Sequence, residues 1–185
     1  MIINLDLDGV MRDFLGALKK QYKKVYPDHK IKPVNRWGLH EFFPIGEDIY
    51  DFIWLEYVKE CLFEADIYDG ALIMMDQLRD RGHEITILTA QPTLQAKNWT
   101  FQWMLDRGVL HRANNVVIID PNSDMDKGYI KGDLILEDAP HHLNDCMNAG
   151  ITTVCYDQPW NQGWRQGHRV KTYDEFIEIV DRLSR

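Results

Sequence analysis

The sequence has few cysteines, no long apolar run and no excess of basic residues. Its three cysteines are scattered through 185 residues without a CxxC pair, so we expect neither a disulfide framework nor a zinc site. No stretch approaches the ~18 apolar residues of a membrane span. The N-terminal apolar run has no basic region before it, unlike a signal peptide. These absences predict a protein of the reducing cytoplasm with no membrane partner.

The charge balance also excludes a class of partners. The chain has 21 basic and 29 acidic residues, a formal net charge of −8. Such a surface repels polyphosphates, so we expect no nucleic-acid polymer as a partner. A small phosphorylated ligand is still compatible, because one local positive site could hold it.

Short apolar runs alternate with helical patterns along most of the chain. This alternation predicts an α/β protein with a parallel sheet covered on both faces. The expected strands are residues 2–7, 85–88, 116–119, 134–136 and 152–156. The expected helices are residues 12–26, 47–63, 69–81, 93–107, 140–150 and 173–183, with an irregular segment at 27–44 and a loop at 157–169.

One interval interrupts this rhythm. The first two expected strands are separated by residues 8–84, which are 77 residues and too many for a single crossover. We therefore expect a small helical cap at residues 26–67, inserted into an α/β core formed by residues 1–25 and 68–185.

Polar side chains follow four of the expected strands. Ligands of open α/β sheets bind beyond the carboxyl ends of the strands, so these groups are expected to converge at one edge. The first strand is followed by two aspartates and a glycine, and the others by a hydroxyl, an amine and further acids. They are Asp6, Asp8, Gly9, Thr89, Ala90, Asp120, Lys127, Glu137 and Asp138.

Asp6 and Asp8 lie two residues apart at a strand end. Ionising two carboxylates this close together costs free energy unless a cation lies nearby. Asp138 adds a third acid from another strand. Such an oxygen-rich site suits Mg²⁺, which keeps several waters and bridges to phosphate. A DxD pair by itself is also compatible with a loop whose aspartates cap the next helix, and Thr89 and Lys127 could be a local hydroxyl and a solvated amine.

These residues resemble the motifs of the haloacid dehalogenase-like phosphohydrolases, and within them most closely those of the 5′(3′)-deoxyribonucleotidases. The first, second and fourth motifs correspond to Asp6-Leu7-Asp8-Gly9-Val10, Ile87-Leu88-Thr89 and the stretch Gly132 to Asp138. For the third motif, a lysine, Lys127 and Lys131 are both candidates, and the family spacing selects Lys127. The chain departs from the nucleotidase pattern at Glu137, where aspartate is more frequent.

The resemblance implies a Rossmann-like three-layer core and a phosphoaspartyl mechanism with Mg²⁺ as cofactor. In it, Asp6 is the nucleophile and Asp8 the acid and base. The metal ligands are Asp6, Asp138 and the main-chain carbonyl of Asp8, while Glu137 orients a metal-bound water. Thr89, the Ala90 N–H and Lys127 hold the phosphate. The resemblance also suggests a homodimer.

The expected substrate is a nucleoside monophosphate, whose base needs a flat apolar slot. Phe14 matches a position that borders the base in the nucleotidases. Trp37 and Phe43, from the cap, are expected to complete the slot, although these aromatics could equally form the core of the cap. Two alternatives stay open: a phosphatase of the same chemistry for another small phosphorylated metabolite, and a non-catalytic binding protein of the same fold.

Overall fold

The computed structural model describes residues 1–184 and is built on one six-stranded sheet. The strand order is β3-β2-β1-β4-β5-β6, and each neighbouring pair is parallel. The predicted α/β fold with a parallel sheet is thereby confirmed. The strands are β1 (Ile2–Leu5), β2 (Glu84–Ala90), β3 (Asn115–Ile119), β4 (Leu134–Glu137), β5 (Thr152–Tyr156) and β6 (His168–Val170).

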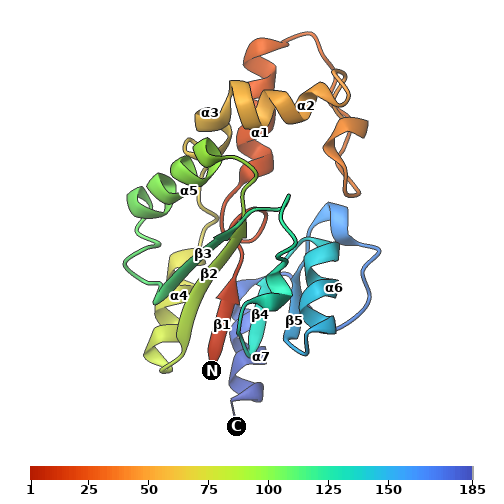
Figure 1. Ribbon diagram of the computed structural model, residues 1–185. Helices are drawn as coiled ribbons and strands as arrows, with labels where there is room; N and C mark the ends of the chain where they lie inside the picture. Colours follow the sequence, from red (N-terminus) through yellow and green to blue (C-terminus); the bar gives the residue numbers. More distant parts are fainter. Residues whose placement is uncertain (185) are drawn as a thin grey trace.

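Helices cover both faces of the sheet and make a three-layer core (Figure 1). Helices α4 (Ala71–Asp80), α5 (Leu94–Asp106) and α7 (Tyr173–Leu183) pack on one face in the main hydrophobic cluster, which includes the fully buried Trp103 and Phe176. Helix α6 (Pro140–Asn148) covers the other face, where Cys146 contacts the cluster of Leu88 and Ile135. Because both faces are covered, the central strands are mostly apolar, with Asn4 of β1 and Thr86 of β2 as buried polar exceptions.

The segment between β1 and α4 forms a second body above the sheet (Figure 1). It contains α1 (Phe14–Val25), the 3₁₀ turn η1 (Leu39–Glu41), α2 (Asp48–Asp51), the π turn η2 (Phe52–Glu56) and α3 (Val58–Leu62). Tyr22 of α1 packs against the rings of Phe43 and Phe52, at centroid distances of 4.9 and 5.5 Å. The buried residues of α1 therefore share a hydrophobic cluster with the inserted segment.

The segment predicted as one helix at residues 47–63 is helical, but it is not a single regular α-helix: α2 runs directly into η2, and the backbone is interrupted once before α3. Ile53 is buried, and the next buried apolar residue is Val58, five positions on rather than the three or four of an α-helix. The π turn accommodates this spacing, and the backbone then leaves the helical region at Tyr57 (φ −122°, ψ 37°). Both halves can thereby bury their apolar sides.

The predicted loop at 157–169 was also wrong in part. It contains the 3₁₀ turn η4 (Pro159–Asn161), and its end enters the short edge strand β6. Three residues, only one of them buried, carry too little periodicity to be recognised as a strand. Over residues 1–184, no helix is long and apolar enough to cross a membrane.

Candidate active site

The loop after β1 is a tight turn that brings Asp6 and Asp8 to the carboxyl end of the sheet. The carbonyl of Leu7 accepts hydrogen bonds from the N–H groups of Met11 and Arg12, at 2.8 and 2.7 Å. Gly9 has a φ of +78°, a conformation that other residues adopt only with strain. The sequence Asp-Leu-Asp-Gly thus folds back on itself directly after the strand.

Lys127 lies between the acids of two neighbouring strands. It begins η3 (Lys127–Tyr129), a turn capped by Asp126, which accepts the N–H of Gly128 at 2.7 Å. The Lys127 Nζ donates to Asp6 Oδ1 at 2.7 Å and to Glu137 Oε2 at 2.5 Å. Lys127 is 1 % exposed, whereas Lys131 lies at the surface, so the geometry agrees with the choice of Lys127.

Asp6, Glu137 and Asp138 form a buried acidic cluster, with one carboxylate oxygen of each within 4.8 Å of the others. Glu137 is already bonded: its Oε1 accepts the N–H groups of Asp138 and Ala139, at 3.0 and 2.9 Å, and its Oε2 accepts from Lys127. Asp6 and Asp138 are therefore better suited to hold a cation than Glu137.

Burial and mutual repulsion distort the acidity of this cluster. Burial, together with the charge of Glu137, raises the pKa of Asp6 to about 7. The same two causes raise the pKa of Asp138 well above its usual range. Burial opposes ionisation of Glu137 too, but Lys127 outweighs it and lowers the pKa of Glu137 to about 2. A cation beside Asp6 and Asp138 would relieve this repulsion.

The carboxylate of Asp8 lies outside this cluster. It accepts two hydrogen bonds from Arg12, at 2.7 and 2.8 Å, and one from Gln91 Nε2 at 3.0 Å. The guanidinium of Arg12 is fully buried, contacts Thr100 Oγ1 at 3.2 Å and lies 5.2 Å from the Trp103 ring centroid. The predicted metal ligand from Asp8, its main-chain carbonyl, stays a prediction.

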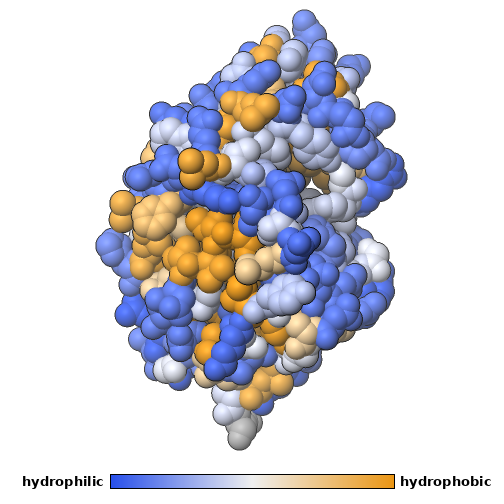
Figure 2. Space-filling view, viewed as in Figure 1, coloured by the Kyte–Doolittle hydropathy of each residue, from blue (hydrophilic) through white to orange (hydrophobic). Residues whose placement is uncertain are grey.

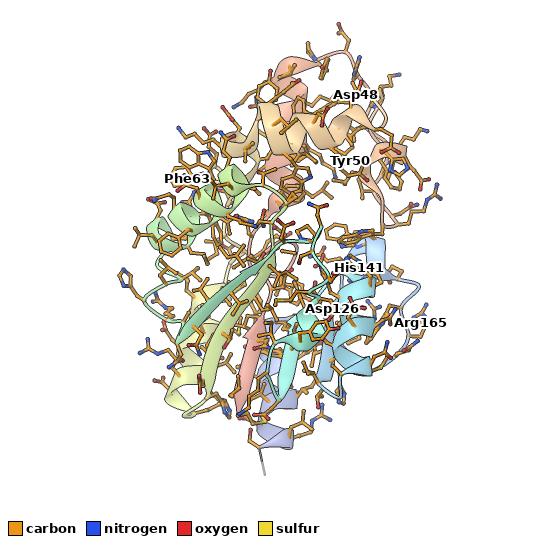
Figure 3. The ribbon with its side chains drawn as sticks, viewed as in Figure 1. Asp48, Tyr50, Phe63, Asp126, His141 and Arg165 are labelled. Atoms are coloured by element: carbon orange, nitrogen blue, oxygen red, sulfur yellow. The ribbon has the colours of Figure 1, made fainter. Side chains whose placement is uncertain are left out.

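A cavity of about 480 Å³ joins the acidic cluster to the cap. Figure 2 shows the molecule hollowed between the cap and the core, and Figure 3 shows Tyr50 and His141 on opposite sides of that space. Nine of the predicted residues line it together. They are Asp6, Asp8, Phe14, Trp37, Thr89, Ala90, Lys127, Glu137 and Asp138.

The cap wall of the cavity is aromatic. The rings of Phe14 and Trp54 are parallel within 4°, at a centroid distance of 5.9 Å. Trp37 is half exposed and meets His141 of the core edge-on at 5.0 Å. Phe43 does not line the cavity: it is 2 % exposed and belongs to the interior of the cap, against Tyr22. The predicted contact of Phe43 with substrate was therefore wrong, because its ring packs inside the cap and does not reach the cavity.

Three side chains make contacts at the site that the sequence does not predict. Arg12 and Gln91 hold Asp8, and Trp160 donates its indole N–H to Asp138 Oδ2 at 2.7 Å. Arg12 stands four residues after Asp8. This spacing predicts a contact between the two side chains only if the loop folds back on itself, which the sequence does not show. Gln91 directly follows Thr89-Ala90 and could have been included in that motif. Trp160 lies in a distant segment, and only the tertiary fold connects it to Asp138.

The fold and the four strand-end groups define a haloacid dehalogenase-like phosphohydrolase. The chain belongs to the family described as 5′ nucleotidase, deoxy (Pyrimidine), cytosolic type C protein, whose model matches residues 1–184. It is accordingly an enzyme of the phosphoric monoester hydrolase class.

Individual relatives agree with this family. A candidate 5′(3′)-deoxyribonucleotidase from Chlorobaculum tepidum is 24 % identical over 175 residues, covering 88 % of this chain and 81 % of the relative. A candidate nucleotidase from Oceanobacillus iheyensis is 26 % identical over 159 residues, 80 % of each chain. The crystal structure of a predicted phosphatase from Clostridium acetobutylicum matches this chain with a TM-score of 0.69 at 16 % identity, over 98 % of each chain.

Another solved structure, a haloacid dehalogenase-like hydrolase from Streptococcus pneumoniae, has the same TM-score of 0.69 at 12 % identity, over 97 % of each chain. At such identities the two structures support the fold alone. They agree with the predicted core.

Proposed function

We propose that this enzyme hydrolyses deoxyribonucleoside monophosphates with Mg²⁺ as cofactor, through a phosphoaspartyl intermediate on Asp6. The observation that carries the proposal is a single cavity with Asp6, Lys127 and Asp138 at its base and the aromatic pair Phe14–Trp54 in its cap wall. A phosphate ester bearing a flat base matches both ends. The family description and the names of the relatives support the nucleotide as substrate.

The donor set fits a divalent cation. Asp6 and Asp138 are hard oxygen donors, buried close together. Burial first, and then repulsion from Glu137, raises the pKa of both groups, and a cation would offset both effects. Mg²⁺ prefers such carboxylates and shares its remaining positions with water and phosphate. A relative in fold, a hydrolase from Bacillus subtilis, has been solved bound to magnesium. Bound here, Mg²⁺ would neutralise charge between nucleophile and phosphate.

The residues of the chain divide the remaining work. A carboxylate oxygen of Asp6 forms a bond to phosphorus as the bond to the nucleoside oxygen breaks, and Asp8 gives that oxygen its proton. Asp8 then takes a proton from the water that attacks the aspartyl phosphate, which releases inorganic phosphate and restores Asp6. Thr89 and the Ala90 N–H hold phosphate oxygens, and Lys127 balances their charge.

Released phosphate tests the activity. Deoxyribo- and ribonucleoside monophosphates, with the phosphate at the 5′ or 3′ position, are incubated with the protein and Mg²⁺ beside a panel of sugar phosphates. We expect release from deoxyribonucleotides and none with Asp6→Asn. Release from sugar phosphates alone would favour the metabolite phosphatase, and release from no compound would favour the non-catalytic alternative.

The intermediate is tested by borohydride reduction of quenched reactions. Borohydride converts a phosphorylated aspartate to homoserine, which identifies the residue that carried the phosphate. By mass spectrometry, we expect this conversion at Asp6 in the native enzyme. The lysine has its own test: Lys127→Met should abolish turnover, and Lys131→Met, which removes a surface amine, is the matched control. A turning-over enzyme without any reduced Asp6 would exclude the phosphoaspartyl route.

Other expectations also stand as proposals. We propose that residues 26–67 act as a cap over the cavity, since Val34, Trp37, Leu39, Tyr50 and Trp54 line it. We propose a cytoplasmic location, which the three buried free thiols support.

We also propose that the protein is a homodimer. Sedimentation of the purified protein tests this, and a monomer at all concentrations would reject it.

A further inference from the structure

The turn after β5 reaches the acidic cluster from a part of the chain outside the four motifs. Trp160, in η4, donates its indole N–H to Asp138 Oδ2 at 2.7 Å. An indole has a single N–H donor with a fixed direction, and Asp138 is 3 % exposed. One oxygen of this carboxylate is therefore tied to a rigid ring.

The turn itself is firmly held. Asn161 Nδ2 donates to the main-chain oxygens of Asp138 and Tyr156, at 2.9 and 2.8 Å, and Asn161 is 1 % exposed. Gln158 Nε2 donates to the Gly9 carbonyl at 2.6 Å. The same turn thus braces both acidic loops, the one after β1 and the one after β4.

The junction between these loops is closely packed. A Cβ placed on Gly9 would lie 2.2 Å from Asp138 Oδ2 and 3.1 Å from the Trp160 ring. The ring of Trp160 also lines the cavity and packs against the hydrophobic cluster of the cap. A side chain at Gly9 would therefore collide with the carboxylate and crowd the ring.

We propose that Trp160 is a positioning residue that fixes the carboxylate of Asp138 for cation binding. Because Oδ2 accepts the indole N–H, Oδ1 would be the oxygen left available to a cation. Groups that orient metal ligands in this way contribute strongly to metal affinity although they do not touch the metal. The inference rests on the proposed role of Asp138 as a metal ligand.

Trp160→Phe tests the inference, because it removes the N–H donor and keeps an aromatic ring. Trp164→Phe is the matched control: Trp164 is 6 % exposed and donates its indole N–H to Asn144 Oδ1 at 3.0 Å, away from the acidic cluster. The readout is the Mg²⁺ dissociation constant of the substrate-free protein, measured by calorimetry. We expect about tenfold weaker binding for Trp160→Phe and less than about a twofold change for Trp164→Phe.

Each outcome is decisive. Equal Mg²⁺ affinity in native and Trp160→Phe proteins, or an equal loss in both variants, overturns the positioning role while leaving the proposed function in place. If the native protein itself binds no Mg²⁺, the proposed metal site fails and the inference fails with it.

A second measurement is made on the native protein and uses Trp160→Phe only to assign one resonance. The native protein is labelled with ¹⁵N-tryptophan, and its six indole N–H resonances are followed during Mg²⁺ titration and then with Mn²⁺, which broadens nearby nuclei. We expect one indole resonance to shift with Mg²⁺ and to broaden first with Mn²⁺. Trp160→Phe assigns it where that variant folds. Six unmoved resonances at saturating Mg²⁺ would reject the inference.

Discussion

Arg12 holds Asp8 through a two-point contact, with Nε to Oδ1 at 2.7 Å and Nη2 to Oδ2 at 2.8 Å. Both carboxylate oxygens accept charge-assisted hydrogen bonds, which fixes the plane of the group. The backbone of Arg12 also forms an isolated antiparallel β-bridge with Ile67, at the end of the cap segment. The proposed acid and base is thereby linked to the junction between cap and core.

Replacing Arg12 by methionine should reduce both stability and activity. It leaves the partly buried Asp8 carboxylate without its cationic partner, and we expect the free energy of unfolding to fall by about 2–3 kcal/mol. Arg12→Lys keeps the charge but loses the planar fork, so we expect an intermediate loss of kcat with KM nearly unchanged.

Urea unfolding and steady-state kinetics measure these effects. Arg81→Met, which breaks the surface pair with Asp181, is the control and should leave kcat unchanged. An Arg12→Lys enzyme with native kcat would show that the fork does not matter for Asp8.

Mg²⁺ should stabilise the protein more at high pH than at low pH. An unfolded aspartate ionises near 4, whereas the pKa of Asp6 in the folded protein is about 7. Between these values the folded state binds more protons, so metal-free stability falls as pH rises through this window. Mg²⁺ requires the ionised form and offsets its repulsion.

Thermal unfolding in EDTA and in Mg²⁺ checks this expectation. The increase in Tm caused by Mg²⁺ should be larger at about pH 8 than at about pH 5, and Asp138→Asn should reduce it at both. A Tm increase independent of pH would contradict the coupling between Asp6 ionisation and metal binding.

The two phenylalanines of the predicted slot should behave differently. Phe14 lines the cavity, so Phe14→Leu should raise KM for a deoxyribonucleotide by about tenfold, equivalent to about 1.4 kcal/mol of lost contact. Phe43→Leu should lower Tm without changing KM, because Phe43 packs inside the cap. Kinetics with methyl phosphate, which has no base, provide the reference: Phe14→Leu should leave its KM unchanged, and a parallel rise would show a general disturbance of the site.

Gly9→Ala should abolish activity, whereas Gly82→Ala should not. Both glycines have nearly the same φ, +78° and +76°, so the backbone strain of a side chain is about 1–2 kcal/mol at either position. Only at Gly9 would the new Cβ collide with Asp138; at Gly82 nothing lies within 4 Å. Phosphate release and Tm distinguish the two effects, and an active Gly9→Ala enzyme would mean that the junction with Asp138 can open.

Much of the core could be predicted because buried strands and their polar ends leave a local signal. Asp6, Thr89 and Asp138 each follow an apolar run, and parallel strands bring such ends to one edge. The sequence therefore predicts that the acids, the hydroxyl and the lysine form one set.

The rest depends on packing that local sequence does not encode. Phe14 of α1 and Phe43 of the cap are both aromatic, and only the tertiary fold turns one to the cavity and the other to Tyr22. The π turn at Phe52–Glu56 follows from how two apolar faces meet α1. Trp160 and Asp138 come from separate loops, and their contact is visible only once β4 and β5 lie side by side.

The brace between Gln158 and Gly9 joins residues 149 positions apart. During synthesis, the loop after β1 emerges from the ribosome well before the turn that supports it. Closing so large a loop is costly in entropy and slow. Catalytic competence should therefore arise late and all at once, and prematurely terminated chains should be inert rather than partly active.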